Sequence, residues 1–223
     1  MTSAVRPYQL VIFDNDGVLV DSEPISNRLL AAYLTELGYP TTFEDSVRDF
    51  MGTAAHTVHD VVRERYGAAL PEGFDDSFHA RVFAAFEAEL TAVPGAAEAV
   101  KAVAAAGVTS CVASSATHAW IRAAHRRTGL EGYFTDRQIF SAQDVGRGKP
   151  APDLFLHAAA AMGVPPECCA VVEDAPMGVA AARAAGMDVY GYTALTPRAR
   201  LAGATALFDD MAELPGLLGM SPV

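Results

Sequence analysis

The fold of this chain follows from the stretch Leu10-Val11-Ile12-Phe13-Asp14-Asn15-Asp16-Gly17. It begins with four apolar residues suited to a strand buried on both faces, and it ends in acidic residues before a glycine. Two later stretches have the same form, because residues 108–113 run into Ser114 and residues 169–172 run into Glu173 and Asp174. Alanine-rich stretches with helical character separate the three apolar runs. Strands that alternate with helices are typical of a parallel sheet.

We therefore expect an α/β protein with a doubly wound parallel sheet that forms a Rossmann-like core. In such sheets, ligands bind just beyond the carboxyl ends of the strands, where the strand order reverses. Asp14, Ser114 and Asp174 each follow an expected strand. These three side chains are expected to meet in one crevice.

The interval between the first two apolar runs is too long for a simple crossover. Residues 18–92 lie in this interval, where a crossover needs roughly a dozen residues. Glycine and proline divide the interval into four amphipathic segments, which we expect to be helices at 22–37, 43–51, 54–66 and 74–90. We predict a helical cap, residues 18–92, inserted into a core formed by residues 1–17 and 93–223.

Composition narrows the class of protein. The 223 residues include 16 Lys or Arg and 27 Asp or Glu, a formal net charge of −11, which argues against nucleic-acid binding. The longest uncharged stretch, residues 102–121, is too polar to span a membrane. With three cysteines and neither a basic leader nor a cleavage site, a cytoplasmic location is expected. The partner is expected to be a small molecule or a protein, and nothing indicates the oligomeric state.

The acidic residues after the strands have two interpretations. Alternate side chains of an extended chain share a face, so Asp14 and Asp16 are expected to point the same way. A turn is the alternative, because Asp, Asn and Gly all suit turns. Three acids in one crevice, with Asp174 as the third, repel each other unless a cation lies among them. Oxygen ligands of this kind suit Mg²⁺.

Two further segments are suited to anions. Lys149 is one of two lysines in a chain with fourteen arginines, and an ammonium group suits a point contact with carboxylate or phosphate. Pro150 follows it where a Walker loop requires Ser or Thr, so that interpretation is excluded. Ser114 and Ser115 precede an expected helix, whose N-terminus favours negative charge, and helix capping is a compatible alternative.

Four motifs together resemble those of the haloacid dehalogenase superfamily, and more narrowly its beta-phosphoglucomutase-like branch of phosphatases and phosphomutases with a helical cap. They are residues 13–23, residues 112–115, residues 148–153, and residues 172–174 with the following 178–187. The motifs occur in the family's order across nearly the whole expected core.

The resemblance implies a phosphoaspartate mechanism. Asp14 would attack phosphorus as the nucleophile, and Asp16 would serve as general acid and then general base. Ser114 and Lys149 would complete the catalytic set by binding a phosphoryl oxygen and neutralising its charge. The expected function is hydrolysis of a small phosphorylated metabolite of the sugar phosphate or phosphoglycolate type.

The resemblance also implies a Mg²⁺ cofactor and a set of substrate contacts. Mg²⁺ would be held by Asp14, the backbone carbonyl of Asp16 and Asp174, with Glu173 in support. Trp120 is expected to be a packing residue rather than a stacking platform. The candidate substrate-binding residues are Asn15, Ser115, Glu23, Arg48 and His56.

Two alternatives remain beside the phosphatase. In the mutases of this branch, a Lys beside a cap glycine and a nearby Arg bind a second phosphate. If Gly52 is that glycine, Met51 and Ala55 take these positions, and neither can bind phosphate, which favours the phosphatase. After the second motif, those mutases have Ser-Lys-Asn, whereas this chain has Ala-Thr-His at residues 116–118. This difference further weakens the binding of a second phosphate. A phosphoacceptor signalling module is less favoured, because Asp16 is suited to releasing the phosphoryl group.

Overall fold

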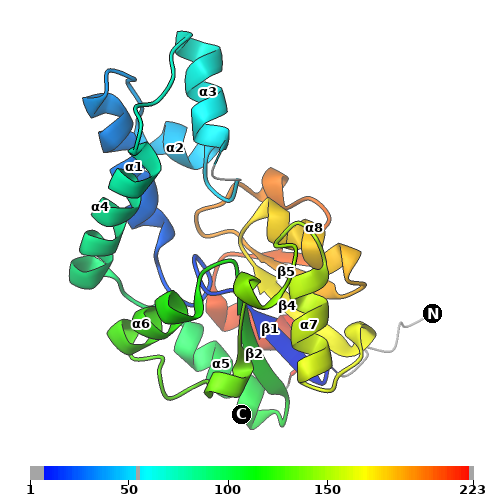
Figure 1. Ribbon diagram of the computed structural model, residues 1–223. Coiled ribbons are helices and arrows are strands. Elements are labelled where there is room, and N and C mark those ends of the chain that lie inside the picture. The colour runs from blue at the N-terminus through cyan, green and yellow to red at the C-terminus, as the bar shows by residue number, and fades with distance from the viewer. Residues whose placement is uncertain (1–7, 54–55, 221–223) are drawn as a thin grey trace.

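A central parallel sheet organises the computed structural model, which describes residues 8–53 and 56–220 and has six strands within them (Figure 1). The strand order is β3-β2-β1-β4-β5-β6, so the first strand lies in the middle and the order reverses beside it. This confirms the predicted doubly wound sheet. The strands are β1 (Leu10–Phe13), β2 (Thr109–Ser114), β3 (Ile139–Ser141), β4 (Cys169–Glu173), β5 (Asp188–Tyr192) and β6 (Ala206–Phe208).

Helices cover both faces of the sheet. On one face pack α5 (Ala96–Ala105), α6 (His118–Thr128) and α9 (Leu214–Leu217), and on the other α7 (Asp153–Ala161) and α8 (Pro176–Ala184). Val11 and Phe13 of β1 belong to the first hydrophobic cluster and Leu10 and Ile12 to the second. All four are fully buried, as expected for a strand enclosed on both faces. Short 3-10 helices lie at Asp136–Gln138, Ala142–Asp144, Pro166–Cys168, Arg198–Leu201 and Met211–Glu213.

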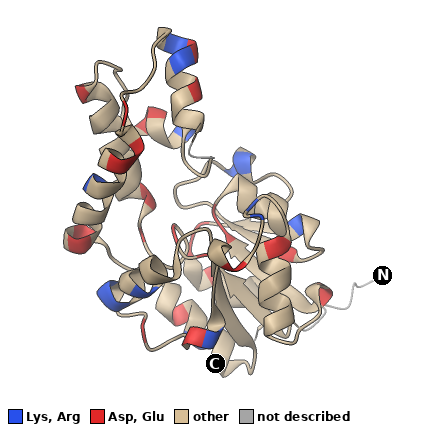
Figure 2. Ribbon diagram, viewed as in Figure 1, with Lys and Arg blue, Asp and Glu red and all other residues tan. Residues whose placement is uncertain are grey.

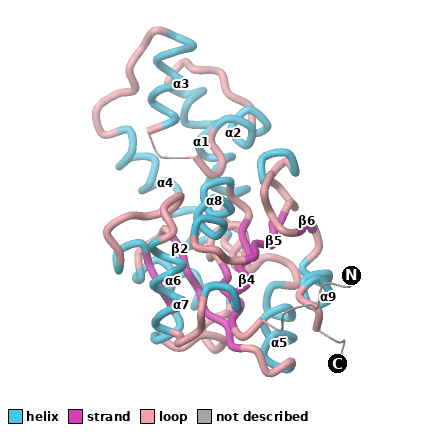
Figure 3. Tube along the Cα trace, turned by 90° about the vertical axis from the view of Figure 1, so that its right-hand side faces the viewer, coloured by secondary structure: helices cyan, strands magenta, loops and turns pink. Residues whose placement is uncertain are grey.

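Four helices between β1 and α5 form a layer of their own beyond the carboxyl ends of the strands (Figures 1 and 3). They have a separate hydrophobic cluster that includes Leu34, Val62 and Phe74. Residues 54–55, the expected start of the third helix, lie outside the described residues. The helices are α1 (Glu23–Glu36), α2 (Phe43–Asp49), α3 (Thr57–Tyr66) and α4 (Phe74–Glu89).

Two segments join this helical layer to the sheet, and they lie side by side. The backbone N–H of Asp21 donates to the carbonyl of Thr91 over 2.9 Å, and the N–H of Val93 donates to the carbonyl of Leu19 over 3.0 Å. Leu19 is fully buried. The chain therefore leaves the sheet and returns to it at one place.

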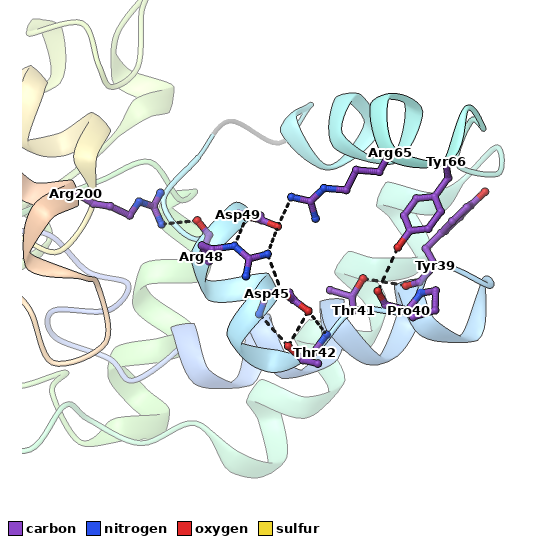
Figure 4. A network of polar contacts seen from close by, with 10 residues as sticks. All are labelled: Tyr39, Pro40, Thr41, Thr42, Asp45, Arg48, Asp49, Arg65, Tyr66 and Arg200. Atoms are coloured by element: carbon purple, nitrogen blue, oxygen red, sulfur yellow. Dashed lines mark hydrogen bonds and ion pairs between the residues drawn. The ribbon is translucent and has the colours of Figure 1, made fainter.

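Arg200 makes a second connection between the two layers, and Figure 4 shows its contact with the backbone carbonyl of Arg48. It lies in the 3-10 helix after β5, and its guanidinium donates to the carbonyl oxygens of Val47 over 3.0 Å and of Met51 over 2.6 Å. These carbonyls belong to the last turn of α2 and the residues after it, where helical carbonyls lack partners within the helix. Arg200 thus binds the C-terminal end of α2 to the core.

The sequence analysis predicts three strands, and the structure adds β3, β5 and β6 at the two sides of the sheet. In β5, Gly191 interrupts the apolar pattern that indicates a strand. A Cβ atom at this position would overlap the side chain of Leu207 in β6, so the glycine allows the two strands to pack.

Charged residues of both signs are spread over the helices of both layers (Figure 2). The three cysteines, Cys111, Cys168 and Cys169, are free thiols. Among the described residues, no helix combines the length and the apolar character that crossing a membrane requires.

Candidate active site

The parallel register brings the ends of three strands together. Phe13 at the end of β1 is paired with Val112 of β2 and with Val172 of β4. The N–H of Asp14 donates to the carbonyl of Val172 over 3.0 Å, which continues the pairing by one residue. The polar residues that follow β1, β2 and β4 therefore meet at one edge of the sheet, as predicted.

A cavity of about 320 Å³ lies between this edge and the helical layer. The core contributes four of the predicted site residues, Asp14, Asp16, Ser114 and Lys149, to its lining. Glu173 and Asp174 line it as well. From the helical layer the lining includes Glu23, Asn27, Met51, Thr53, Asp75, Phe78 and His79.

Lys149 is buried between two carboxylates. Its Nζ atom lies 2.8 Å from Oδ1 of Asp14 and 2.6 Å from Oε1 of Glu173. The side chain is 5% exposed and its ammonium lies 5.0 Å from the ring centre of Phe155. Burial by itself lowers the pKa of Lys149, but the charges of Asp14 and Glu173 outweigh it and raise the pKa above its ordinary value. Lys149 is therefore cationic in the folded protein.

The acidic residues are close enough to share a cation. One carboxylate oxygen from each of Asp14, Glu173 and Asp174 lies within 4.8 Å of the others. Burial raises the pKa of Glu173 to about 7, and the negative charge of Asp14 adds to the increase. Burial and the charges of Glu23 and Glu173 raise the pKa of Asp174 as well. A cation with a preference for oxygen ligands would relieve this repulsion, so the residues fit a metal site.

Two glycines make room for these acids. Gly17 has a φ of 77°, and a Cβ atom there would overlap the carboxylate of Asp174. Gly178 lies in α8 beside Glu173. A Cβ atom on Gly178 would overlap the carboxylate of Glu173. Both glycines are required by close approach, and Gly17 is also required by its left-handed backbone.

Two side-chain hydrogen bonds, one from α6 and one from Asn15, hold the carboxylate of Asp16. Its Oδ1 accepts from Nε1 of Trp120 over 3.1 Å, and its Oδ2 accepts from Nδ2 of Asn15, also over 3.1 Å. The Oδ1 atom of Asn15 lies 3.0 Å from Nε2 of His125. Burial, together with the charge of Asp14, raises the pKa of Asp16. Asn15, a predicted substrate contact, is fully buried behind the lining of the cavity, and its amide supports Asp16.

The sequence of this chain is similar to those of known proteins. The family model described as haloacid dehalogenase-like hydrolase matches residues 8–186, which include β1, β2, β4 and all four motifs up to residue 186. The chain belongs to the haloacid dehalogenase-like hydrolases.

Individual relatives of this hydrolase include a phosphatase and a mutase. It is 33% identical over 187 residues to the 6-phosphogluconate phosphatase of Escherichia coli strain K12, with 83% of each chain covered. It is 31% identical over 247 residues to the beta-phosphoglucomutase of Mycobacterium bovis, which covers 91% of this chain and 90% of that enzyme. The crystal structure of a conserved haloacid dehalogenase-like protein of unknown function from Agrobacterium tumefaciens matches with a TM-score of 0.89 and 33% identity, covering 95% and 98% of the two chains.

Glu23 and the two serines of the hydrolase lie where the sequence analysis expects them. Glu23 lines the cavity, and its Oε2 atom accepts from Nδ2 of Asn27 over 3.0 Å. Burial, together with the charge of Asp16, raises the pKa of Glu23 to about 7. Ser114 is buried and accepts from the N–H of Ala116 over 3.0 Å, whereas Ser115 is exposed to the cavity.

Two residues of the hydrolase that are expected to contact substrate, Arg48 and His56, lie outside the lining of the cavity. Arg48 is 59% exposed, and its guanidinium binds Asp45 and Asp49 at 2.8 Å each (Figure 4). His56 is 76% exposed and lies 3.9 Å from Asp60, its nearest ion-pair partner. Neither belongs to the lining of the cavity. Acidic neighbours within the helical layer lie beside both side chains, and the structure places neither residue at the cavity.

The positions that distinguish mutases carry no positive charge facing the cavity in the described part of the hydrolase. Met51 lines the cavity, and Ala55 lies outside the described residues. His118 binds Asp144 at 2.8 Å instead of entering the cavity. Among the described lining residues, Lys149 provides the one lysine or arginine side chain.

Sequence reasoning missed Trp120 and His125 as residues of the site. Trp120 is expected to be a packing residue, and it does stack on Phe86 of α4 with ring centres 4.7 Å apart. Its indole N–H also reaches Asp16, 104 positions earlier in the sequence. No spacing in the sequence indicates such a contact, because it depends on how α6 packs beside β1.

Proposed function

We propose that this chain is a Mg²⁺-dependent phosphatase that hydrolyses a small phosphorylated metabolite, such as a sugar phosphate, through an aspartyl phosphate formed on Asp14. The observation that carries the proposal is the position of Asp14, which lines the cavity, binds Lys149 and lies within reach of two further acids. The phosphatase among the relatives, named for 6-phosphogluconate, supports the substrate class.

The reaction requires two transfers of the phosphoryl group. A carboxylate oxygen of Asp14 attacks phosphorus, the bond between phosphorus and the ester oxygen breaks, and Asp16 donates a proton to the leaving oxygen. Water then attacks the aspartyl phosphate while Asp16 accepts its proton, which releases inorganic phosphate and restores Asp14. The raised pKa of Asp16 suits a group that must hold a proton in one step and accept one in the next.

A phosphate dianion can approach an aspartate only where positive charge cancels the repulsion. Lys149 provides one such charge beside Asp14, and Ser114 and Ser115 can donate hydrogen bonds at the N-terminal end of α6. Asp14, the backbone carbonyl of Asp16 and Asp174 would hold Mg²⁺, with Glu173 in support. When bound, Mg²⁺ supplies further positive charge to the phosphoryl oxygens.

The lining of the cavity favours a phosphatase over a mutase. A mutase must bind a second phosphate, and Lys149 is the one lysine or arginine among the described lining residues. A phosphomutase remains the second candidate, supported by the identity with the beta-phosphoglucomutase of Mycobacterium bovis. A signalling module is less favoured, because no helical insertion is expected after the first strand of such a module, and here four helices follow β1.

The division into two domains is part of the same proposal. Residues 18–92 would act as a cap over a core of residues 1–17 and 93–223, supported by the separate hydrophobic cluster of the helical layer. Closure of the cap would exclude water other than the hydrolytic one. A cytoplasmic setting is proposed as well, supported by the free thiols of Cys111, Cys168 and Cys169.

A screen of phosphate release tests the proposal. The purified protein is incubated with Mg²⁺ and a set of small phosphoesters, and β-glucose 1-phosphate with its bisphosphate is included to detect isomerisation. We expect release of inorganic phosphate from one or more sugar phosphates, and no release by Asp14→Asn. Isomerisation without net hydrolysis would favour the mutase instead. Phosphorylation of the protein without turnover of any ester would favour the signalling module.

A further inference from the structure

We propose that His125 is a positioning residue for proton transfer: it fixes the side-chain amide of Asn15, which in turn holds the carboxylate of Asp16. This inference rests on the proposed function, because it takes Asp16 as the general acid and base. His125 does not line the cavity and contacts neither Asp14 nor the other acids of the metal site.

The chemistry of the groups fixes the direction of each hydrogen bond. As a general base, Asp16 is ionised and its carboxylate only accepts hydrogen bonds, so the amide nitrogen of Asn15 faces it. As a general acid, Asp16 directs its proton to the leaving oxygen and keeps acceptor lone pairs for the same amide N–H. The amide oxygen of Asn15 then faces His125, and an oxygen of this kind accepts only. Nε2 of His125 must therefore carry the ring proton. His125 donates to Asn15, and Asn15 donates to Oδ2 of Asp16, where the chain of hydrogen bonds ends.

The surroundings of His125 keep its ring neutral. The residue is 1% exposed, and its ring centre lies 5.7 Å from that of Phe134. Its Nδ1 atom is buried and has no hydrogen-bond partner among the described residues. Because a protonated ring would leave a second N–H buried without a partner, burial lowers the pKa of His125 to about 4. A single N–H remains, and Asn15 accepts it.

The second oxygen of Asp16 is held from the same helix. Trp120 and His125 both belong to α6, and Trp120 donates to Oδ1 of Asp16 while His125 acts on Oδ2 through Asn15. Asn15 is fully buried, so its amide has no solvent partner to replace His125. Without the N–H of His125, the amide of Asn15 can rotate and turn its oxygen toward Asp16, which would repel the carboxylate.

The test compares two leaving groups. A sugar phosphate requires a proton on its leaving oxygen, whereas p-nitrophenolate leaves without one. The value of kcat/KM reports the steps up to formation of the aspartyl phosphate, where this difference acts. We expect His125→Phe to lower kcat/KM for the sugar phosphate roughly tenfold more than for p-nitrophenyl phosphate, a part of the hundredfold or greater contribution of a positioned acid.

Two further variants separate positioning from packing. Phe134→Leu disturbs the same pocket around the ring and leaves the N–H of His125 in place, so it is expected to change both substrates equally. In an Asp16→Asn background, His125→Phe is expected to cause less than about a twofold further loss, because the group that it positions is absent. Equal losses on both substrates, or a full additional loss in the Asp16→Asn background, would overturn the inference.

A conservative variant and a spectroscopic measurement complete the test. His125→Gln offers an amide N–H and is expected to retain more sugar phosphate activity than His125→Phe. In the wild-type protein, the ¹⁵N shifts of His125 are expected to show a neutral ring protonated at Nε2 at pH 7, and a proton on Nδ1 would refute the hydrogen-bond chain. This measurement needs no turnover, so it decides the positioning even if no phosphoester is hydrolysed, a result that would overturn the proposed function alone.

Discussion

Lys149 and Asp14 are 135 positions apart in the sequence, and their side chains form a buried ion pair of 2.8 Å. The same ammonium binds Glu173 at 2.6 Å, and Asp174 lies in the same cluster. Three carboxylates and one ammonium leave a formal charge of −3 + 1 = −2 when all four groups are ionised. A divalent cation balances this charge. The arrangement therefore fits the proposed metal site, in which a divalent cation and Lys149 together offset the three carboxylates.

Replacing the proposed nucleophile should remove turnover and leave the fold intact. Asp14→Asn keeps the size of the side chain but lacks the negative charge that attacks phosphorus, so we expect kcat to fall by roughly a thousandfold or more. Steady-state phosphate release measures the loss, and circular dichroism checks the fold. Substantial activity in this variant would contradict the assignment of Asp14.

Removing the metal should abolish the phosphatase activity reversibly. EDTA is expected to abolish phosphate release, and added Mg²⁺ to restore it, because the acids near Asp14 otherwise repel an anionic substrate. Binding of Mg²⁺ to the folded state should also raise the melting temperature, by an amount that grows with the logarithm of the Mg²⁺ concentration above its Kd. Activity that survives complete chelation would count against metal dependence.

Lys149→Met should destabilise the protein more than an ordinary lysine substitution. It leaves Asp14 and Glu173 buried without their cation, and loss of one partner from a buried pair costs about 3–5 kcal/mol. Lys101→Met is the matched control, because Lys101, the other lysine, lies over the ring of Tyr133 near the surface. Urea unfolding without Mg²⁺ measures the difference, and equal midpoints for the two variants would show that the pair contributes nothing.

His125 should make the stability depend on pH. Its pKa is about 4 in the folded protein and 6.5 in the unfolded chain, so the unfolded chain binds more protons between these values. The free energy of unfolding that depends on the neutral His125 ring is fully present above about pH 6.5. It decreases by about 3 kcal/mol in total as the pH falls toward 4.

The comparison with His125→Phe isolates this contribution. Glu23 and Glu173 have raised pKa values of about 7, so they act in the opposite direction and stabilise the folded state as the pH falls. Their contribution is common to both proteins. The unfolding free energy of the wild type, minus that of His125→Phe, should therefore decrease between pH 7 and pH 4. A constant difference would show that His125 is not held neutral.

Arg200→Ala should loosen the contact between α2 and the core. Arg200 donates to the carbonyls of Val47 and Met51, and Met51 lines the cavity. Two hydrogen bonds from a charged donor contribute enough to raise KM roughly tenfold when they are lost. Arg198→Ala is the control, since Arg198 lies in the same 3-10 helix and binds the carbonyl of Leu207 within the core. Identical KM values for the two variants would exclude a role for the contact.

The fold was predictable where the strands are central in the sheet and continuously apolar. β1, β2 and β4 lie inside the sheet, and helices cover both of its faces. Successive side chains of these strands are therefore buried on one face or the other, which requires a continuous apolar run. β3 and β6 have three residues each and lie at the sides of the sheet, so they leave no such run. In β5, Gly191 makes room for Leu207 and breaks the pattern.

The site was predictable where its residues directly follow strands. Asp14, Ser114 and Asp174 are placed by the register of the sheet, which the sequence pattern indicates. The sequence does not indicate where the side chains of His56 and Arg48 lie, because their direction depends on acidic neighbours within the helical layer. The supporting residues of α6 gave no signal, since packing between a helix and a distant strand has no period in the sequence.

The paired backbone of Leu19 with Val93 and of Asp21 with Thr91 has a consequence for the evolution and engineering of this architecture. Entry to and exit from the helical layer are adjacent, so an unrelated bundle could be spliced in at this junction without shifting the register of any strand. Selectivity and reactivity can then diversify on separate segments of one gene.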